Sequence, residues 1–181
     1  MIFGFIGGSR SNLRLIDRLH GDIMAAVRQA SLYTDYGVVD SFDGRFEVLT
    51  LLASATVRRL ASLPAPGPEL AQELTDALFR HFEIALREMG VGDLTVPKRI
   101  KSLAEAYLGR AKTYAAAVAE PGDDALVTAL ARNVYGRAPA EAPRAARLAR
   151  YLRAVEAKLS ETPLTVFEAG PILFPDAASV D

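Results

Sequence analysis

The chain has 181 residues and a formal net charge of −1, with half of its residues hydrophobic and about a quarter charged, which is typical of one globular domain and excludes a disordered chain. A net charge so close to zero creates no global basic field, so binding to anionic lipid or RNA requires a local patch, and we expect no specific DNA binding. Because the chain has no cysteine, disulfides, thiolate nucleophiles and cysteine-ligated metal sites are excluded.

The abundance of Ala, Leu and Arg favours helix over strand, so we expect an all-α protein. The opening MIFGFIGGSR has no basic residue ahead of its apolar run and no small-residue cleavage pattern, which makes it a poor signal peptide. No segment approaches twenty uninterrupted apolar residues, the length needed to span a bilayer. We therefore expect a soluble cytoplasmic protein, with peripheral contact at the inner face of the cytoplasmic membrane as a second option.

The first predicted helix starts at a cap formed by Ser11 or Asn12 and fades near Ser31, because apolar residues recur there every three or four positions. A loop over residues 32–44 follows. The second helix, of about 20 residues and about 30 Å, continues to Leu63 and ends at a proline-rich turn.

A third helix is predicted over residues 68–89, since proline suits a first helical turn and Gly90 suits a left-handed terminator. Its apolar arc is unusually wide, because Phe79 and Leu86 lie well round the cylinder from Phe82. We expect this helix to be covered on two sides.

The pattern predicts a fourth helix near residues 97–119, a fifth that Asp123 caps and Gly136 closes, and a sixth over 142–160. The arginines of the sixth helix advance by three residues and spread over half of the cylinder, which favours a solvated face. They are Arg144, Arg147, Arg150 and Arg153.

The tail over residues 161–181 is apolar but interrupted by Gly170, Pro171 and Pro175, so we expect no helix in it. Free tails rarely carry so much apolar surface, which indicates that the tail docks in extended form at least as far as Phe174. The predicted architecture is a single-domain bundle of about six helices over residues 12–160, with this tail docked on it.

The usual signatures of enzymes and metal proteins are absent from the sequence. It has two histidines, His20 and His81, with no partner in motif spacing, so we expect two ordinary helix residues rather than a metal or haem site. It contains no nucleophile elbow, P-loop or dinucleotide fingerprint. We expect neither a cofactor nor a metal.

The connection before the second helix is dense in special residue types. Its paired carboxylates, Asp40 and Asp43, could form a magnesium site for a diphosphate substrate, but no second acidic motif faces them. The structural alternative is that Asp40, Ser41 or Asp43 caps the second helix while Arg45 folds back onto a carboxylate.

Basic residues occupy the first turns of the fourth helix, where the macrodipole disfavours each exposed cation by about 0.3 to 1 kcal/mol. Lys98 and Lys101 lie on one face and form a small basic ridge. Two interpretations stay open: solvated charges with Glu105 pairing to Lys101, or recognition of an acidic partner, lipid headgroup or RNA backbone.

The segment LARNVYG, residues 130–136, crowds Arg132, Asn133 and Tyr135 at the end of a short helix. Either Asn133 satisfies terminal carbonyls while Tyr135 packs, or the segment is a partner site.

Three segments of this sequence resemble the ubiquinol-cytochrome c chaperones in their amino-acid sequence, their order and their spacing. They are LYTDYGVVDSFDGRFEVLTL at 32–51, LREMGVGDLTVPKRIKSLAEAYLGRAKTY at 86–114, and LARNVYG at 130–136. The resemblance covers roughly residues 12–160 and is specific rather than a single short pattern.

This resemblance implies an all-helical protein that has no catalytic activity or cofactor and assists the assembly of respiratory complex III. Relatives of this kind in mitochondria bind newly made cytochrome b as a client, associate with a second small assembly factor and contact the ribosome. The rival hypotheses are a helical enzyme that acts on a diphosphate through Asp40 and Asp43 with magnesium, and a helical adaptor with no link to respiration.

For a chaperone, the candidate contact residues come from the three resembling segments and from the wide apolar arc of the third helix, where a groove could open if the tail moved aside. They are Tyr36, Asp40, Asp43, Arg45, Phe79, Phe82, Leu86, Lys98, Lys101, Arg132 and Asn133.

Overall fold

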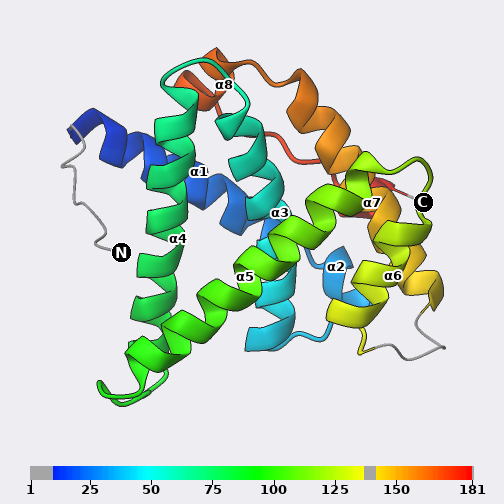
Figure 1. Ribbon diagram of the computed structural model, residues 1–181, viewed down its shortest axis with the longest axis horizontal. Coiled ribbons are helices and arrows are strands. Elements are labelled where there is room, and N and C mark those ends of the chain that lie inside the picture. The colour runs from blue at the N-terminus through cyan, green and yellow to red at the C-terminus, as the bar shows by residue number, and fades with distance from the viewer. Residues whose placement is uncertain (1–9, 137–141, 181) are drawn as a thin grey trace.

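The computed structural model describes residues 10–136 and 142–180, and in this part of the chain every regular element is a helix (Figure 1). The predicted all-α class is confirmed. The helices are α1 (Arg10–Val27), α2 (Ser31–Thr34), α3 (Phe42–Ala61), α4 (Gly67–Glu88), α5 (Val96–Ala119), α6 (Asp124–Asn133), α7 (Ala142–Glu161), α8 (Leu164–Ala169) and the final 3-10 turn η2 (Ala177–Ser179). The predicted absence of a signal peptide concerns residues 1–9, which lie outside the described residues.

No helix in the described ranges combines the length and the apolarity that crossing a bilayer requires. The cap of α1 also differs from the prediction: the helix already includes Arg10, so Ser11 and Asn12 are inside it. The side chain of Asn12 instead donates from Nδ2 to Oε1 of Glu73 on α4, at 3.4 Å.

Helix α3 is the central element of the fold. It packs against α1, α4, α5 and α7, and in Figure 1 these helices surround it. Its middle is buried on every side, because residues on all faces have almost no exposed surface, among them Val48, Leu51, Leu52, Ala53 and Ala55. A helix that is apolar all round has to lie inside the protein.

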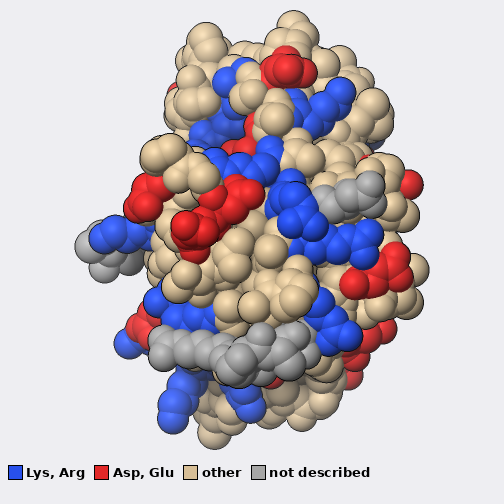
Figure 2. Space-filling model, turned by 90° about the vertical axis from the view of Figure 1, so that its right-hand side faces the viewer, with Lys and Arg blue, Asp and Glu red and all other residues tan. Residues whose placement is uncertain are grey.

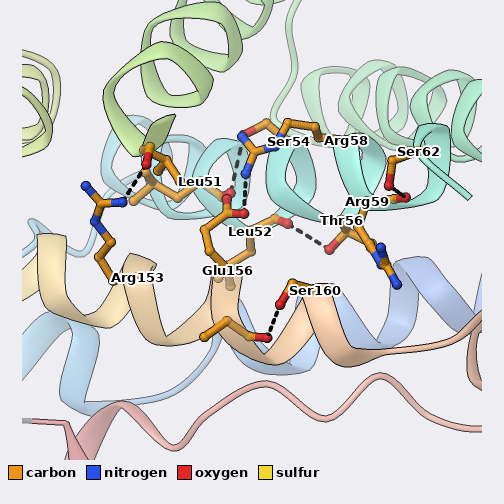
Figure 3. A network of polar contacts seen from close by, with 12 residues as sticks. Leu51, Leu52, Ser54, Thr56, Arg58, Arg59, Ser62, Arg153, Glu156 and Ser160 are labelled. Atoms are coloured by element: carbon orange, nitrogen blue, oxygen red, sulfur yellow. Dashed lines mark hydrogen bonds and ion pairs between the residues drawn. The ribbon is translucent and has the colours of Figure 1, made fainter. Parts of the chain in front are cut away.

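The hydroxyl groups in the middle of α3 are largely satisfied within the helix itself. Thr56 donates from Oγ1 to the carbonyl of Leu52 at 2.8 Å, and Ser54 donates to the carbonyl of Leu51 at 3.3 Å. Figure 3 shows the Arg58 side chain of α3 and the Glu156 side chain of α7 pointing toward each other, where they form an ion pair. Most polar groups of this part of α3 are therefore paired, and the buried Thr50 hydroxyl is an exception, with no hydrogen-bond partner among the described residues.

Helix α4 is covered by α1, α3 and α5, which confirms the predicted two-sided cover. Phe82 of α4 packs against Phe46 of α3 with ring centroids 5.5 Å apart, and Phe79 meets Tyr107 of α5 edge-on at 5.6 Å. The hypothesis of a groove beneath the tail is therefore wrong, because α3 and α5 cover this face. Phe82 and Leu86 are only 7% and 4% exposed.

The tail docks on the opposite side of α3, against α1, α2 and α7. Its buried anchors are Phe167, Ile172 and Ala177. Gln29, which follows α1, holds it by accepting from the backbone N–H of Ala177 at 2.6 Å, and the Tyr36 hydroxyl donates to the carbonyl of Ala177 at 2.8 Å. The docking of the tail agrees with the prediction.

The prediction that the tail contains no helix is wrong for one short stretch. Residues 164–169 form α8, which Pro163 precedes in an extended conformation. The helix-breaking pair of Gly170 and Pro171 comes after this stretch, so six residues are free to complete a turn and bury Phe167.

Two arginines of α7 do not form the predicted solvated face. The Arg147 guanidinium lies 4.6 Å from the centroid of the Tyr36 ring. Arg153 pairs from Nε with Oδ1 of Asp123 at 3.1 Å and donates to the carbonyl of Glu120 at 3.1 Å. Asp123 therefore binds α7 and leaves α6 without the predicted side-chain cap.

The two histidines meet at the interface of α1 and α4. Their rings stack with centroids 3.8 Å apart and an interplanar angle of 13°, and Nδ1 of His81 lies 2.8 Å from the carbonyl oxygen of Ala77. Burial, together with the adjacent His81 ring, lowers the pKa of His20 to about 4. Two stacked rings in contact favour the neutral form of His20.

This histidine pair predicts a loss of stability in mild acid. The unfolded chain binds a proton at His20 near pH 6.5, whereas the folded chain does so only near pH 4, so stability is complete above pH 6.5 and falls as pH drops toward 4. We expect a loss of about 1 kcal/mol in the free energy of unfolding, because solvent screening at this partly exposed ring reduces the effect. Urea titrations between pH 7 and 4.5 measure it, and a His20→Gln variant that keeps the full loss would contradict the assignment.

The docked tail predicts a second stability effect. Phe167→Ala removes a fully buried ring and is expected to lower the free energy of unfolding by about 3 to 5 kcal/mol. The matched control is Leu173→Ala, because Leu173 lies in the same tail but is 65% exposed, and its change should stay within about 0.5 kcal/mol. Equal effects of the two variants in chemical denaturation would mean that the tail does not dock through Phe167.

Candidate functional site

The segments around residues 36–51, 86–114 and 130–136 are brought together by α3, α5 and α6. The connection before α3 and the end of α6 are joined by a hydrogen bond from the Tyr135 hydroxyl to the backbone carbonyl of Tyr36, at 2.9 Å. Helix α5 lies against both α3 and α6. Three stretches that are far apart in the sequence therefore form one structural unit.

An ion pair joins α3 to α5 within this unit. Arg110 binds Glu47 through two contacts, Nε to Oε2 at 2.7 Å and Nη2 to Oε1 at 2.6 Å, and its guanidinium lies 5.6 Å from the centroid of the Phe46 ring. Burial raises the pKa of the Glu47 carboxyl, although Arg110 acts in the opposite direction. A carboxylate at this position therefore needs Arg110 to remain charged.

A second link joins α5 to α6. Asn133 donates from Nδ2 to the hydroxyl of Tyr114 at 3.1 Å, and its Oδ1 accepts from Nε of Arg132 at 3.1 Å. Burial raises the pKa of the Tyr114 hydroxyl, so this group stays protonated at neutral pH. Asn133 thus binds a neighbouring helix instead of the terminal carbonyls that the sequence suggested.

Outside these links, the surface between α5 and α6 is hollowed. A cavity of about 310 Å³ opens there, lined by Glu105, Gly109, Arg110, Thr113, Arg132 and Asn133. A Cβ atom placed on Gly109 would point into open space, with no neighbour within 4 Å. Arg110 is already engaged by Glu47 and Glu105 adds a carboxylate to the lining, so Arg132 is the cation of the hollow that can bind a carboxylate or another polar anionic group.

The unusual composition of the connection over residues 36–45 has structural causes. A Cβ atom on Gly44 would lie 1.9 Å from the carbonyl oxygen of Val39, so only glycine fits there. The Ser41 side chain caps α3 by accepting from the N–H of Gly44 at 3.1 Å. Arg45 folds back onto Asp40 with Nε 2.6 Å from Oδ1, as the sequence predicted.

The rival hypothesis of magnesium and diphosphate chemistry gains no support from this connection. Asp40 is engaged by Arg45, and Asp43 lies exposed in the first turn of α3, where the helix dipole favours a carboxylate. Among the described residues, no three His, Cys, Asp or Glu side chains are grouped as a metal site would need.

The structure divides the candidate contact residues into buried and exposed groups. Tyr36, Phe82 and Leu86 are core residues and Phe79 is partly buried against the core, so these side chains support the fold in this conformation. Exposed candidates are Asp40, Asp43, Arg45, Lys98, Lys101 and Arg132, and Asn133 is half-buried.

The basic ridge meets the hollow only at its edge. Lys98 lies in the first turn of α5, about 10 Å along the helix from Glu105, the nearest lining residue of α5, at about 1.5 Å per residue. Lys101 is exposed and 3.9 Å from Glu105, a separation at which a surface pair contributes little.

Charges are mixed on the side of the molecule that carries α6 and α7. Figure 2 shows basic and acidic side chains interleaved there with uncharged surface between them. A partner on this face is therefore selected by local pairing rather than by a field of one sign.

Two links that hold the unit together were not predicted from the sequence: the ion pair of Glu47 with Arg110 and the hydrogen bond to Tyr114. One signal was present: Glu47 is a lone carboxylate at the start of an otherwise apolar run, and buried carboxylates require a cation. Its partner could not be chosen, because several basic residues follow in the chain.

The pair of Glu47 and Arg110 predicts a marked asymmetry between variants. Arg110→Met leaves a buried carboxylate without a cation and should lower the free energy of unfolding by about 3 kcal/mol, whereas adding Glu47→Met should restore much of that loss. Arg87→Met is the surface control, because Arg87 pairs with Glu83 in the open at 2.9 Å and should cost at most about 1 kcal/mol. Chemical denaturation of these variants checks the prediction, and a double variant less stable than Arg110→Met would refute it.

Comparisons with known proteins agree with the resemblance that these segments show in their sequence. The family model described as ubiquinol-cytochrome C chaperone matches residues 34–174. The crystal structure of the Cbp3 homolog from Brucella abortus is similar to this chain with a TM-score of 0.86 and 34% sequence identity, covering 95% of this chain and 94% of that one. The comparison with curated proteins gave no match. This chain belongs to the ubiquinol-cytochrome c chaperone family.

Proposed function

We propose that this protein is a non-catalytic assembly chaperone for respiratory complex III, ubiquinol-cytochrome c reductase, and that its client is newly made cytochrome b. The observation that carries the proposal is family membership over residues 34–174. This range includes all three segments of the structural unit that α3, α5 and α6 form. A second small assembly factor and the ribosome are further partners that the resemblance suggests. A cytoplasmic location with peripheral contact at the membrane suits a client that is itself inserted there.

The hollow between α5 and α6 is the best candidate for a contact with the client or a partner factor. Arg132 is exposed and, in the described part of the chain, only its Nε is engaged, by Asn133. Its terminal nitrogens are thus available to bind a carboxylate in the fork geometry typical of arginine. A polar hollow of this kind suits a segment of the client that lies on the aqueous side of the membrane.

The apolar part of the client needs a different surface, and the structure limits where it can be. The wide arc of α4 is used within the fold, since Phe82 packs on Phe46. Outside the connection between α4 and α5, exposed large apolar side chains of the described residues occur singly on separate elements, such as Leu108 on α5 and Leu173 in the tail. Client binding through polar loops therefore fits the surface better than a continuous apolar groove.

Deleting the gene tests the proposed function directly. The expected result is loss of cytochrome b absorbance and of assembled complex III, while the other cytochromes persist. Crosslinking followed by purification of the tagged protein from native membranes should recover cytochrome b. A deletion strain with normal complex III would refute the proposal and favour the adaptor hypothesis.

Complementation of that strain tests the hollow. Arg132→Glu reverses the charge of its exposed guanidinium, so we expect at least about a tenfold drop in crosslinked cytochrome b, with folding retained because surface substitutions rarely change stability by more than about 0.5 kcal/mol. Arg80→Glu, an equivalent reversal on the exposed surface of α4, is the matched control. Equal recovery of cytochrome b with both variants would remove the hollow from the proposal while leaving the chaperone function intact.

A further inference from the structure

The connection between α4 and α5 exposes apolar side chains at one tip of the molecule, seen at the lower left of Figure 1. Leu94 is 98% exposed and Met89 is 54% exposed, and Val91 between them is half-buried. Single exposed apolar residues are ordinary in soluble proteins. A leucine with almost its whole surface in water, beside an exposed methionine on a protruding turn, needs an explanation from outside the fold.

Basic side chains follow this tip along α5. Lys98, Arg99 and Lys101 are all exposed in its first two turns, near the helix end whose dipole repels cations. Within the described ranges Lys98 and Arg99 form no ion pair, and Lys101 reaches Glu105 only at 3.9 Å. The fold therefore gains no stability from placing three cations here.

Acidic residues also lie near the tip. Arg87 pairs with Glu83 at 2.9 Å and also with Asp93, so one guanidinium is shared by two carboxylates. Glu88 is a further exposed carboxylate on this turn. The charges are therefore segregated: the carboxylates lie at the end of α4 and in the turn that follows it, and the cations Lys98 and Arg99 lie at the start of α5.

The spacing between the apolar tip and the basic residues matches the depth of a lipid headgroup layer. Leu94 lies in the turn just before α5 begins at Val96, and at about 1.5 Å of rise per residue Lys98 and Lys101 lie about 3 and about 8 Å along the helix from Val96. Apolar groups of peripheral proteins enter the bilayer by about 5 to 10 Å. Leu94 at the acyl boundary would therefore hold these cations among the phosphates.

We propose that this tip docks on the surface of an anionic lipid bilayer, with Met89 and Leu94 inserted and Lys98, Arg99 and Lys101 bound to headgroup phosphates. A bilayer fits better than an RNA backbone, because the turn offers no aromatic ring on which bases could stack. An RNA backbone also offers no apolar environment in which a fully exposed leucine could be buried. This inference rests on the peripheral membrane contact named in the proposed function, but it does not depend on the identity of the client.

Vesicle cosedimentation of the full chain tests the proposal. We expect binding to vesicles of phosphatidylcholine mixed with phosphatidylglycerol, and little binding to phosphatidylcholine alone. Leu94→Ser should lower the partition coefficient several-fold, and the pair Lys98→Glu with Lys101→Glu should lower it by at least about tenfold. Matched controls are Leu173→Ser and the pair Arg80→Glu with Lys158→Glu, which change exposed residues on other elements and should stay within about twofold.

The same measurements contain the outcomes that would overturn the proposal. No binding to the anionic vesicles would do so, as would equal losses in the charge pair and its control, since that reports net charge alone. A loss on charge reversal with no effect of Leu94→Ser would refute insertion, because binding to the headgroups would then be electrostatic alone. Circular dichroism spectra of all variants confirm that each one is folded before its binding is compared.

Discussion

The burial of α3 on every side is the constraint from which the rest of the structure follows. A helix with no solvent-facing side needs neighbours all round, and α1, α4, α5 and α7 supply them. Its polar groups then need partners inside the protein: Thr56 donates to a carbonyl of its own helix, and Glu47 is held by Arg110. The hydrogen bond of Thr56 stabilises only α3 itself. The ion pair of Glu47 with Arg110 joins α3 to α5 and so fixes the surface on which the hollow lies.

Within the structural unit that α3, α5 and α6 form, some residues maintain the fold and others are available to bind a partner. Gly44 and Ser41 shape the connection before α3, and the amide of Asn133 donates to the hydroxyl of Tyr114. Such residues can be typical of a family because the fold needs them, without touching a partner. Arg132 differs, because its fixed neighbour Asn133 orients the guanidinium while leaving the terminal nitrogens exposed. A preorganised cation of this kind binds an anion at a lower entropic cost than a mobile one.

What the sequence predicted well depends on neighbours along the chain, and what it missed depends on neighbours in space. Apolar periodicity located the long helices, and the pairing of Arg45 with Asp40 was foreseen because the two residues lie five positions apart. Glu47 and Arg110 are 63 positions apart, and periodicity identifies a buried face without identifying the residue that covers it. For the same reason Arg147 was predicted to be solvated although it covers the Tyr36 ring. Helix α8 was missed because proline and glycine flank it closely, while burial of Phe167 decides its conformation.

Helix α5 carries part of both proposed surfaces, one at its first turns and one along its middle, and its rigidity sets their relation. The rise of an α-helix places Arg110, at the rim of the hollow, about 18 Å beyond Lys98 near the tip. A protein docked through the tip would hold the hollow near the membrane but clear of the headgroups, within reach of aqueous loops of an inserted client. Because Leu94 and Arg132 lie on different elements and share no partner, their effects are separable, and free energies of distant sites normally add within about 0.5 kcal/mol. Membrane docking and client recognition can therefore be lost independently, which distinguishes two surfaces on one helix from a single extended site.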